Sequence, residues 1–181
     1  MLVAGPDLPG ASEEVAALGG LYRDARVLAP PVSTVDAVVD ALRGARLAHL
    51  ACHGRLRADN PTFSSFLLSA GELTVHELSL RGVAPHRVVL SACDSGADAT
   101  YDGDEFVGFV SALLGQGTAG LLASCVQVSD VEAVPLMTDV HERLLRGATL
   151  PEAVHGASVD CSSDRPEALA VRAGFTAYGA G

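Results

Sequence analysis

The chain has 181 residues, enough for one domain with a full hydrophobic core but too few for two comfortable ones. Apolar residues make up 49% of it, charged residues 19% and aromatic residues 4%, which excludes a disordered chain and requires a core of alanine, valine and leucine. The net charge of −10 comes without any run rich in lysine or arginine, so basic peptides or proteins are expected as partners and nucleic acids are not.

Signals for a membrane span, a leader peptide or disulfides are missing from the printed sequence. No apolar run reaches the roughly 18 residues that a bilayer requires, and the opening MLVAGPDLPGASEE lacks the basic start and apolar block of a signal peptide. The four cysteines show no paired spacing. We therefore expect one soluble, cytoplasmic domain over residues 1–181 with reduced thiols and no membrane partner.

The first third of the chain alternates short apolar runs with segments of helical period. The expected strands cover residues 1–6, 25–28 and 46–52. Between them, Ser12 is expected to cap a helix that runs to about Arg23. A second helix begins at Ser33 or Thr34 and ends at Gly44, where a left-handed cap costs little.

A hairpin is expected next, turning at Ala70 and Gly71, and the spacing of Thr74 and Glu77 is that of a capping box for a short helix. Further strands are expected at residues 87–93, 119–128 and 174–181. A helix follows the Gly/Asp-rich loop at 94–105, a second is capped by Asp130, and the last is capped by Thr149. Residues 159–168 resemble a loop. The alternation predicts a mostly parallel sheet covered by helices on both faces.

Two reactive side chains stand where expected strands end. His53 follows the third strand and Cys93 ends the fourth, and the carboxyl ends of parallel strands form the binding edge of an open sheet. If these strands are neighbours, about 4.8 Å apart, the imidazole and the thiol can meet across that edge. A thiolate that attacks an acyl carbon and an imidazole that moves protons are what nucleophilic catalysis needs. The N–H groups of Gly54 and Cys93 are suited to bind the oxyanion.

The same residue types also allow plainer interpretations. A cysteine in an apolar strand is usually a small core residue, which is the role expected for Cys52 and Cys125. Cys93 differs because a polar loop follows it. His49, Cys52 and His53 superficially resemble a metal site, but in a strand the two histidines lie about 13 Å apart and the cysteine points to the other face. We therefore expect no metal and no cofactor.

Several segments together carry a resemblance to a known family. HLACHG, followed forty residues later by VVLSACDSG and then by GDE at the start of a helix, resembles the CHAT family, which comprises caspase-like domains associated with tetratricopeptide repeats. LVAGPDLPGASEEV, SSFLLSAGELTVHEL and FTAYGAG are similar to further segments of the family, so the resemblance covers nearly the whole chain. It implies an α/β fold, a caspase-like three-layer sandwich with a mostly parallel six-stranded sheet.

The resemblance also implies an activity, because the family belongs with the caspases, separases and gingipains among the cysteine peptidases. His53 and Cys93 match the family's catalytic dyad, and Gly54 matches its oxyanion position. The implied protein is an endopeptidase that cuts a protein or peptide substrate under the control of a repeat region, so we expect residues 1–181 to be part of a longer chain. Two departures are the absence of tryptophan from ASCVQVSD and the presence of Pro135 within a helix.

Acidic residues are the candidates for substrate selection. Asp94, Asp104 and Glu105 follow Cys93, and Asp130 follows the fifth expected strand. An acidic rim would favour arginine or lysine before the cleaved bond through direct ion pairing. The plainer interpretation is that these carboxylates are solvated or stabilise helix N-termini.

Two other functions stay open. A chain that keeps the fold without activity would be a scaffold or interaction domain, and the presence of both dyad residues favours the enzyme. A flavodoxin-like nucleotide or phosphate binder would need a glycine-rich loop after the first strand. Neither G-x-G-x-x-G nor G-x-x-x-x-G-K-[ST] occurs there, so this function is disfavoured.

Overall fold

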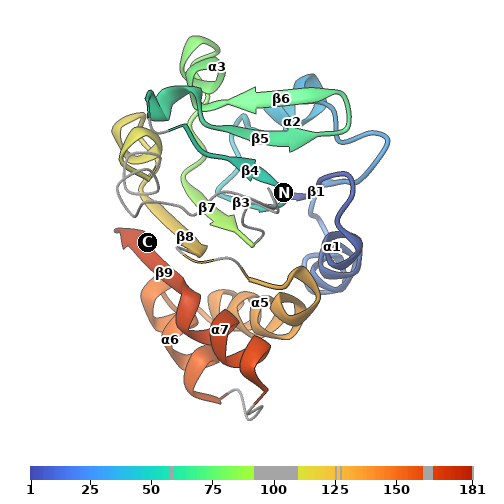
Figure 1. Ribbon diagram of the computed structural model, residues 1–181, viewed down its shortest axis with the longest axis vertical. Helices are drawn as coiled ribbons and strands as arrows, with labels where there is room; N and C mark the ends of the chain where they lie inside the picture. Colours follow the sequence, from blue (N-terminus) through green and yellow to red (C-terminus); the bar gives the residue numbers. More distant parts are fainter. Residues whose placement is uncertain (58, 92–109, 125, 127, 161–164, 181) are drawn as a thin grey trace.

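A six-stranded sheet forms the centre of the computed structural model, which describes residues 1–181 except 58, 92–109, 125, 127, 161–164 and 181 (Figure 1). The strand order is β2-β1-β3-β7-β8-β9, and only β9 runs antiparallel to its neighbour. The strands are β1 (Leu2–Ala4), β2 (Val27–Leu28), β3 (Leu47–Ala51), β7 (Arg87–Leu90), β8 (Gly120–Ser124) and β9 (Phe175–Gly179).

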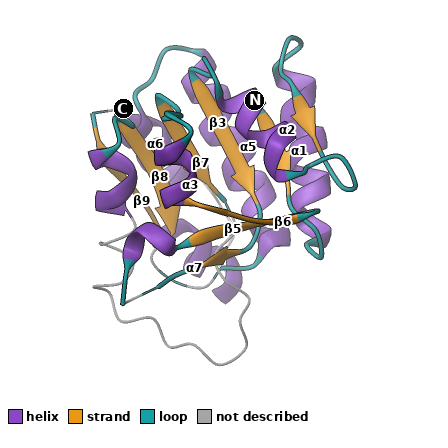
Figure 2. Ribbon diagram, turned by 90° about the horizontal axis from the view of Figure 1, so that it is seen from above, coloured by secondary structure: helices purple, strands orange, loops and turns teal. Residues whose placement is uncertain are grey.

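Helices cover both faces of this sheet, as Figures 1 and 2 show. One face carries α1 (Pro9–Leu21), α5 (Asp130–Leu145), α6 (Leu150–Asp160) and α7 (Pro166–Gly174). The other face carries α2 (Val35–Leu42), α3 (Val75–Leu80), a helix at 110–115, the turn η1 (Pro61–Phe63) and a small antiparallel sheet of β4 (Gly54–Arg55), β5 (Ser65–Leu68) and β6 (Gly71–Thr74). The predicted three-layer α/β sandwich is confirmed.

The two-residue repeat of β3 decides which side chains reach which layer. Ala48 and Leu50 pack into the layer of α2 and the small sheet, whereas His49 and Ala51 face α1 and α5. Successive residues of a strand point to opposite faces, and both faces are covered here, so β3 is buried on both sides. This double burial explains why the strand is almost continuously apolar.

The capping predictions are correct at three helices and wrong at two. The Thr34, Thr74 and Thr149 hydroxyls accept the N–H groups three residues on, as expected. The first helix begins at Pro9 and not after Ser12, because the fixed φ of proline suits the first helical position. In α5 the cap is Ser129, so Asp130 is the first helical residue.

The end of the chain differs most from expectation. Residues 159–168 were expected as a loop, but α6 continues to Asp160 and α7 begins at Pro166. Ala168 and Val171 of α7 are buried against the sheet layer, which supplies the stabilisation that local sequence does not. The hairpin turn is also centred one residue earlier than predicted, since Leu68 pairs directly with Gly71. Pro135 lies inside α5 without ending it.

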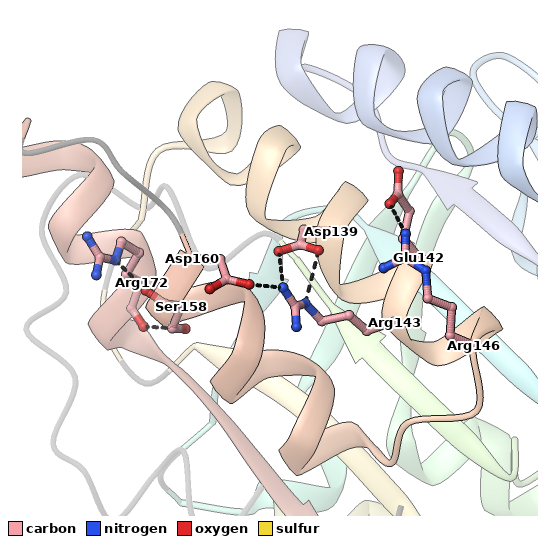
Figure 3. Close-up of polar contacts among 7 residues, drawn as sticks. All are labelled: Asp139, Glu142, Arg143, Arg146, Ser158, Asp160 and Arg172. Carbon is pink, nitrogen blue, oxygen red and sulfur yellow. Dashed lines mark hydrogen bonds and ion pairs between the residues drawn. The ribbon is translucent and has the colours of Figure 1, made fainter.

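Polar contacts add to the apolar packing of α5, α6 and α7 (Figure 3). The Arg143 guanidinium donates to Asp139 one turn earlier and to Asp160 at the end of α6. A Cβ atom at Gly156 would overlap this guanidinium, so the glycine lets Arg143 cross α6 closely. Arg172 of α7 donates to the Ser158 carbonyl oxygen at 2.7 Å. Together these contacts orient the last three helices relative to one another.

Candidate active site

The strands that precede His53 and Cys93 are neighbours, which meets the condition set from the sequence. β3 and β7 run parallel, with Leu47 opposite Arg87 and Leu50 opposite Leu90. The pairing continues past β7, because the Ser91 N–H donates to the Leu50 carbonyl oxygen at 3.2 Å. Cys93 itself lies outside the described residues.

His53 lies two residues beyond the carboxyl end of β3, and its side chain is half-buried. Its carbonyl oxygen accepts the Leu67 N–H at 2.8 Å, which ties the end of β3 to the small sheet. The next residue, Gly54, already belongs to β4 and pairs with Phe66. The backbone on both sides of the histidine is therefore held by hydrogen-bonded strands.

The small sheet also determines the direction of the Gly54 N–H. In an antiparallel ladder, hydrogen-bonded and non-hydrogen-bonded pairs alternate. Because the Leu67 N–H bonds to the His53 carbonyl, the adjacent pair of Gly54 and Phe66 is a non-hydrogen-bonded pair. The Gly54 N–H therefore points away from β5, toward the outer edge of β4, and takes no part in the hydrogen bonds between these two strands.

Close backbone packing from the neighbouring strand β1 supports the end of β3. The Gly5 N–H donates to the Ala51 carbonyl oxygen at 2.8 Å. A Cβ atom on Gly5 would lie 2.5 Å from the Cβ of Cys52 and 3.0 Å from the Leu67 carbonyl oxygen, so no larger residue fits. Cys52 itself is buried in the α2 layer, and burial raises the pKa of its thiol to about 12. The expectation that Cys52 is a core residue is confirmed.

The basic residues after His53 are neutralised by nearby acids. Arg55 forms an ion pair with Glu72, which also accepts the Ser65 hydroxyl at 2.7 Å. Arg57 binds Asp59 through two nitrogens, at 2.9 and 2.8 Å. These arginines therefore add little net positive charge to the His53 side of the edge.

Asp130 has a structural role in the described residues. Its Oδ2 accepts the Gly10 N–H, at the second position of α1, at 2.8 Å, and its Oδ1 accepts the Val131 N–H of its own helix. The carboxylate thus lies at two helix N-termini, where negative charge is favourable. The other three acidic candidates, Asp94, Asp104 and Glu105, lie outside the described residues.

One group of polar residues was not anticipated from the sequence. Glu14, Tyr22, His49 and His141, called here the buried tetrad, form a continuous chain between α1, β3 and α5. Glu14 Oε1 lies 2.7 Å from His49 Nε2, His49 Nδ1 lies 3.0 Å from His141 Nε2, and His141 Nδ1 lies 3.0 Å from the Tyr22 hydroxyl. The available signal was the presence of Glu14 in the apolar stripe with Val15 and Leu18.

The tetrad does not form a metal site in the described part of the chain. Glu14 and His141 contact opposite nitrogens of His49, so no single point lies within bonding distance of all three. No group of three or more candidate ligands occurs among the residues that the structure describes. None of the described helices has the length and hydrophobicity needed to cross a bilayer.

Comparisons with known proteins give a family and a fold. The sequence model of the CHAT domain matches residues 1–180, so the chain belongs to the CHAT domain family. The structure resembles the crystal structure of the Arg-specific cysteine proteinase gingipain R with a TM-score of 0.57 and 14% identity, over 98% of this chain and 44% of that one. The complex of the Porphyromonas gingivalis RgpB pro- and mature domains gives a TM-score of 0.56 and 13% identity, over 99% of this chain and 46% of that one.

The two structural matches limit what can be said of this chain. At 13–14% identity the likeness concerns the fold, which this chain shares with those two structures. The chain spans less than half the length of each of those two chains. The comparison with curated proteins gave no match.

Proposed function

We propose that this domain is a cysteine endopeptidase in which Cys93 is the nucleophile and His53 the general acid and base. The observation that supports this most is the register of β3 and β7, which pairs each residue with the residue forty positions later. The same offset of forty separates His53 from Cys93. Two reactive side chains at matching positions beyond adjacent parallel strands are the arrangement that the chemistry requires.

The proposed reaction has two steps. His53 accepts the Cys93 thiol proton, the thiolate attacks the substrate carbonyl carbon, and the amine leaves with a proton from His53, which yields a thioester. Water, deprotonated by His53, then cleaves the thioester and restores the thiol. The N–H groups of Gly54 and Cys93 would stabilise the oxyanion of both tetrahedral intermediates, and the outward direction of the Gly54 N–H supports this role.

We further propose that the domain cuts after a basic residue of a protein or peptide substrate and is regulated by a repeat region of a longer chain. Asp94, Asp104 and Glu105 are the candidates for binding the basic side chain. Asp130 is the weakest of the acidic candidates, because it already accepts the Gly10 N–H. The pairing of Arg55 with Glu72 supports the proposal, since it removes a competing positive charge.

A fluorogenic peptide library varied at the residue before the cleaved bond tests this function. The wild-type domain should cleave peptides with arginine or lysine there, and Cys93→Ala should abolish cleavage. Cys52→Ala is the matched control, because Cys52 is buried in the α2 layer and should not affect turnover. Steep preference for acidic peptides would contradict the acidic pocket.

The alternative is a catalytically silent scaffold with the same fold. It would be favoured if neither the domain nor the longer protein cleaved any peptide in the library. Activity only in the longer protein would instead support the proposed regulation.

A further inference from the structure

The buried tetrad lies on the side of the sheet opposite to the small sheet, and three of its four side chains are shielded from solvent. Glu14, His49 and His141 are each at most 1% exposed, and they come from α1, β3 and α5 respectively. Polar side chains are rarely placed in such a layer unless they are paired, because each loses its hydration. The tetrad is therefore a specific connection between these three elements.

The net charge of the tetrad depends on how many protons its imidazoles carry. The tetrad contains one carboxylate, Glu14, and two imidazoles. If the two neutral imidazoles gain one additional proton, the resulting positive charge is balanced by the Glu14 carboxylate, 2.7 Å from His49. A second proton would give two imidazolium rings whose facing nitrogens, His49 Nδ1 and His141 Nε2, lie 3.0 Å apart, with the single carboxylate of Glu14 to balance them. Repulsion and the loss of hydration both oppose that state in the interior.

His141 is the ring that resists this second proton. Its burial, and then the neighbouring His49, lower the pKa of His141 from 6.5 to about 2. The unfolded chain accepts a proton on this histidine near pH 6.5, whereas the folded protein does not. Because the unfolded state binds more protons below this pH, stability is present above pH 6.5 and falls as the pH decreases.

Solvent can reach the outer end of the tetrad. Tyr22 is half-buried and lines two cavities of about 540 and 320 Å³, both far larger than a water molecule. Burial raises the pKa of Tyr22 to about 12, so its hydroxyl keeps its proton and can bond both to His141 Nδ1 and to water. The cavities thus offer a route by which a proton can reach the imidazoles.

We propose that the buried tetrad is a pH-sensitive latch, which fastens α1 and α5 to β3 at neutral pH and releases α5 when a second proton binds to its imidazoles. The groups that act on His141 are His49 from β3, Tyr22 from the end of α1 and the positively charged amino terminus of Met1, and the carboxylate of Glu14 faces His49. Since no other ionised acid contacts the imidazoles among the described residues, nothing there compensates the second charge. The latch does not depend on peptidase activity.

Urea unfolding between about pH 5 and about pH 7.5 tests the latch. The unfolding equilibrium constant of the wild type should rise by up to about tenfold for each pH unit below about 6.5. His141→Gln keeps a hydrogen-bonding side chain that cannot be protonated, so it should remove a dependence of about one proton. His155→Gln is the matched control on the exposed surface of α6 and should keep the wild-type slope. A His141→Gln slope equal to that of the wild type would overturn the proposal.

A second measurement decides the question even if His141→Gln does not fold. The ring nitrogens of the wild-type histidines can be followed by NMR, together with amide hydrogen exchange in α5 and in α2 on the other face. We expect the His141 ring to stay neutral in the folded state at about pH 5, and α5 to lose protection toward acid pH before α2 does. A His141 ring that titrates near pH 6.5 in an intact fold, or equal loss of protection in both helices, would contradict the latch.

Discussion

His49 and His53 lie four residues apart on the same stretch of chain, yet their surroundings are opposite. His49 is inside β3, fully buried, with its two ring nitrogens near Glu14 and His141. His53 lies beyond the strand, half-buried at the carboxyl edge of the sheet. The end of β3 lies between the two residues, so His49 is enclosed by α1 and α5 whereas His53 is partly accessible to solvent.

The difference shows how one strand can serve stability and chemistry together. An enclosed imidazole has fixed partners, and changing them costs folding energy. An imidazole at the edge keeps room for a substrate and for proton exchange. We therefore expect substitutions at His49 to affect mainly stability and substitutions at His53 to affect mainly turnover.

The largest expected effect is on turnover. His53→Gln should lower kcat/KM for a cleavable peptide by about a hundred- to ten-thousandfold, because proton transfer in both proposed steps passes through this imidazole. Its urea midpoint should stay near that of the wild type, since the residue is only half-buried. An unchanged kcat/KM would show that His53 is not the acid–base residue.

The next effect is on stability. His49→Leu should lower the free energy of unfolding by about 3–5 kcal/mol, because it leaves the buried Glu14 carboxylate without its partner. Urea unfolding measures this loss. The double variant Glu14→Leu and His49→Leu should recover part of it, since no unpaired acid then remains. A single variant that lost less than about 1 kcal/mol would show that the pair is not ionised.

A smaller effect should appear in both stability and turnover. Gly5→Ala should cost about 1–3 kcal/mol, because the added Cβ overlaps Cys52, the residue that directly follows β3. The resulting shift of the strand end should also lower turnover. Gly20→Ala is the matched control, because no atom lies within 4 Å of its added Cβ and alanine favours the helix. Equal stability of the two variants would contradict the close packing at Gly5.

The smallest effect concerns the outer end of the tetrad. Tyr22→Phe removes only the hydroxyl that contacts His141 Nδ1 and should cost about 0.5–1.5 kcal/mol in urea unfolding. The loss should be largest at neutral pH, where His141 is neutral and bonded. No measurable loss at any pH would show that this contact does not contribute to stability.

Local patterns were sufficient for much of the fold. The apolar runs predicted the strands of the main sheet, and the residues at Thr34 and Thr74 predicted two helix starts, because capping depends on neighbours a few positions away. α7 was missed, since its burial against the sheet supplies what its short sequence lacks. The start of α1 was misplaced because a serine is a common cap but a proline is equally suited to the first turn.

The polar sites also differ in how far the sequence predicted them. The order of strands and polar loops was enough to predict that His53 follows a strand end and that another strand precedes Cys93. The pairing of these two strands was only a condition of the hypothesis, and the tertiary structure decided it. The buried tetrad depends on contacts between residues as far as 119 positions apart. Only the packing of α1 and α5 on β3 brings an acid and two imidazoles together there, because no local signal records which buried faces will meet.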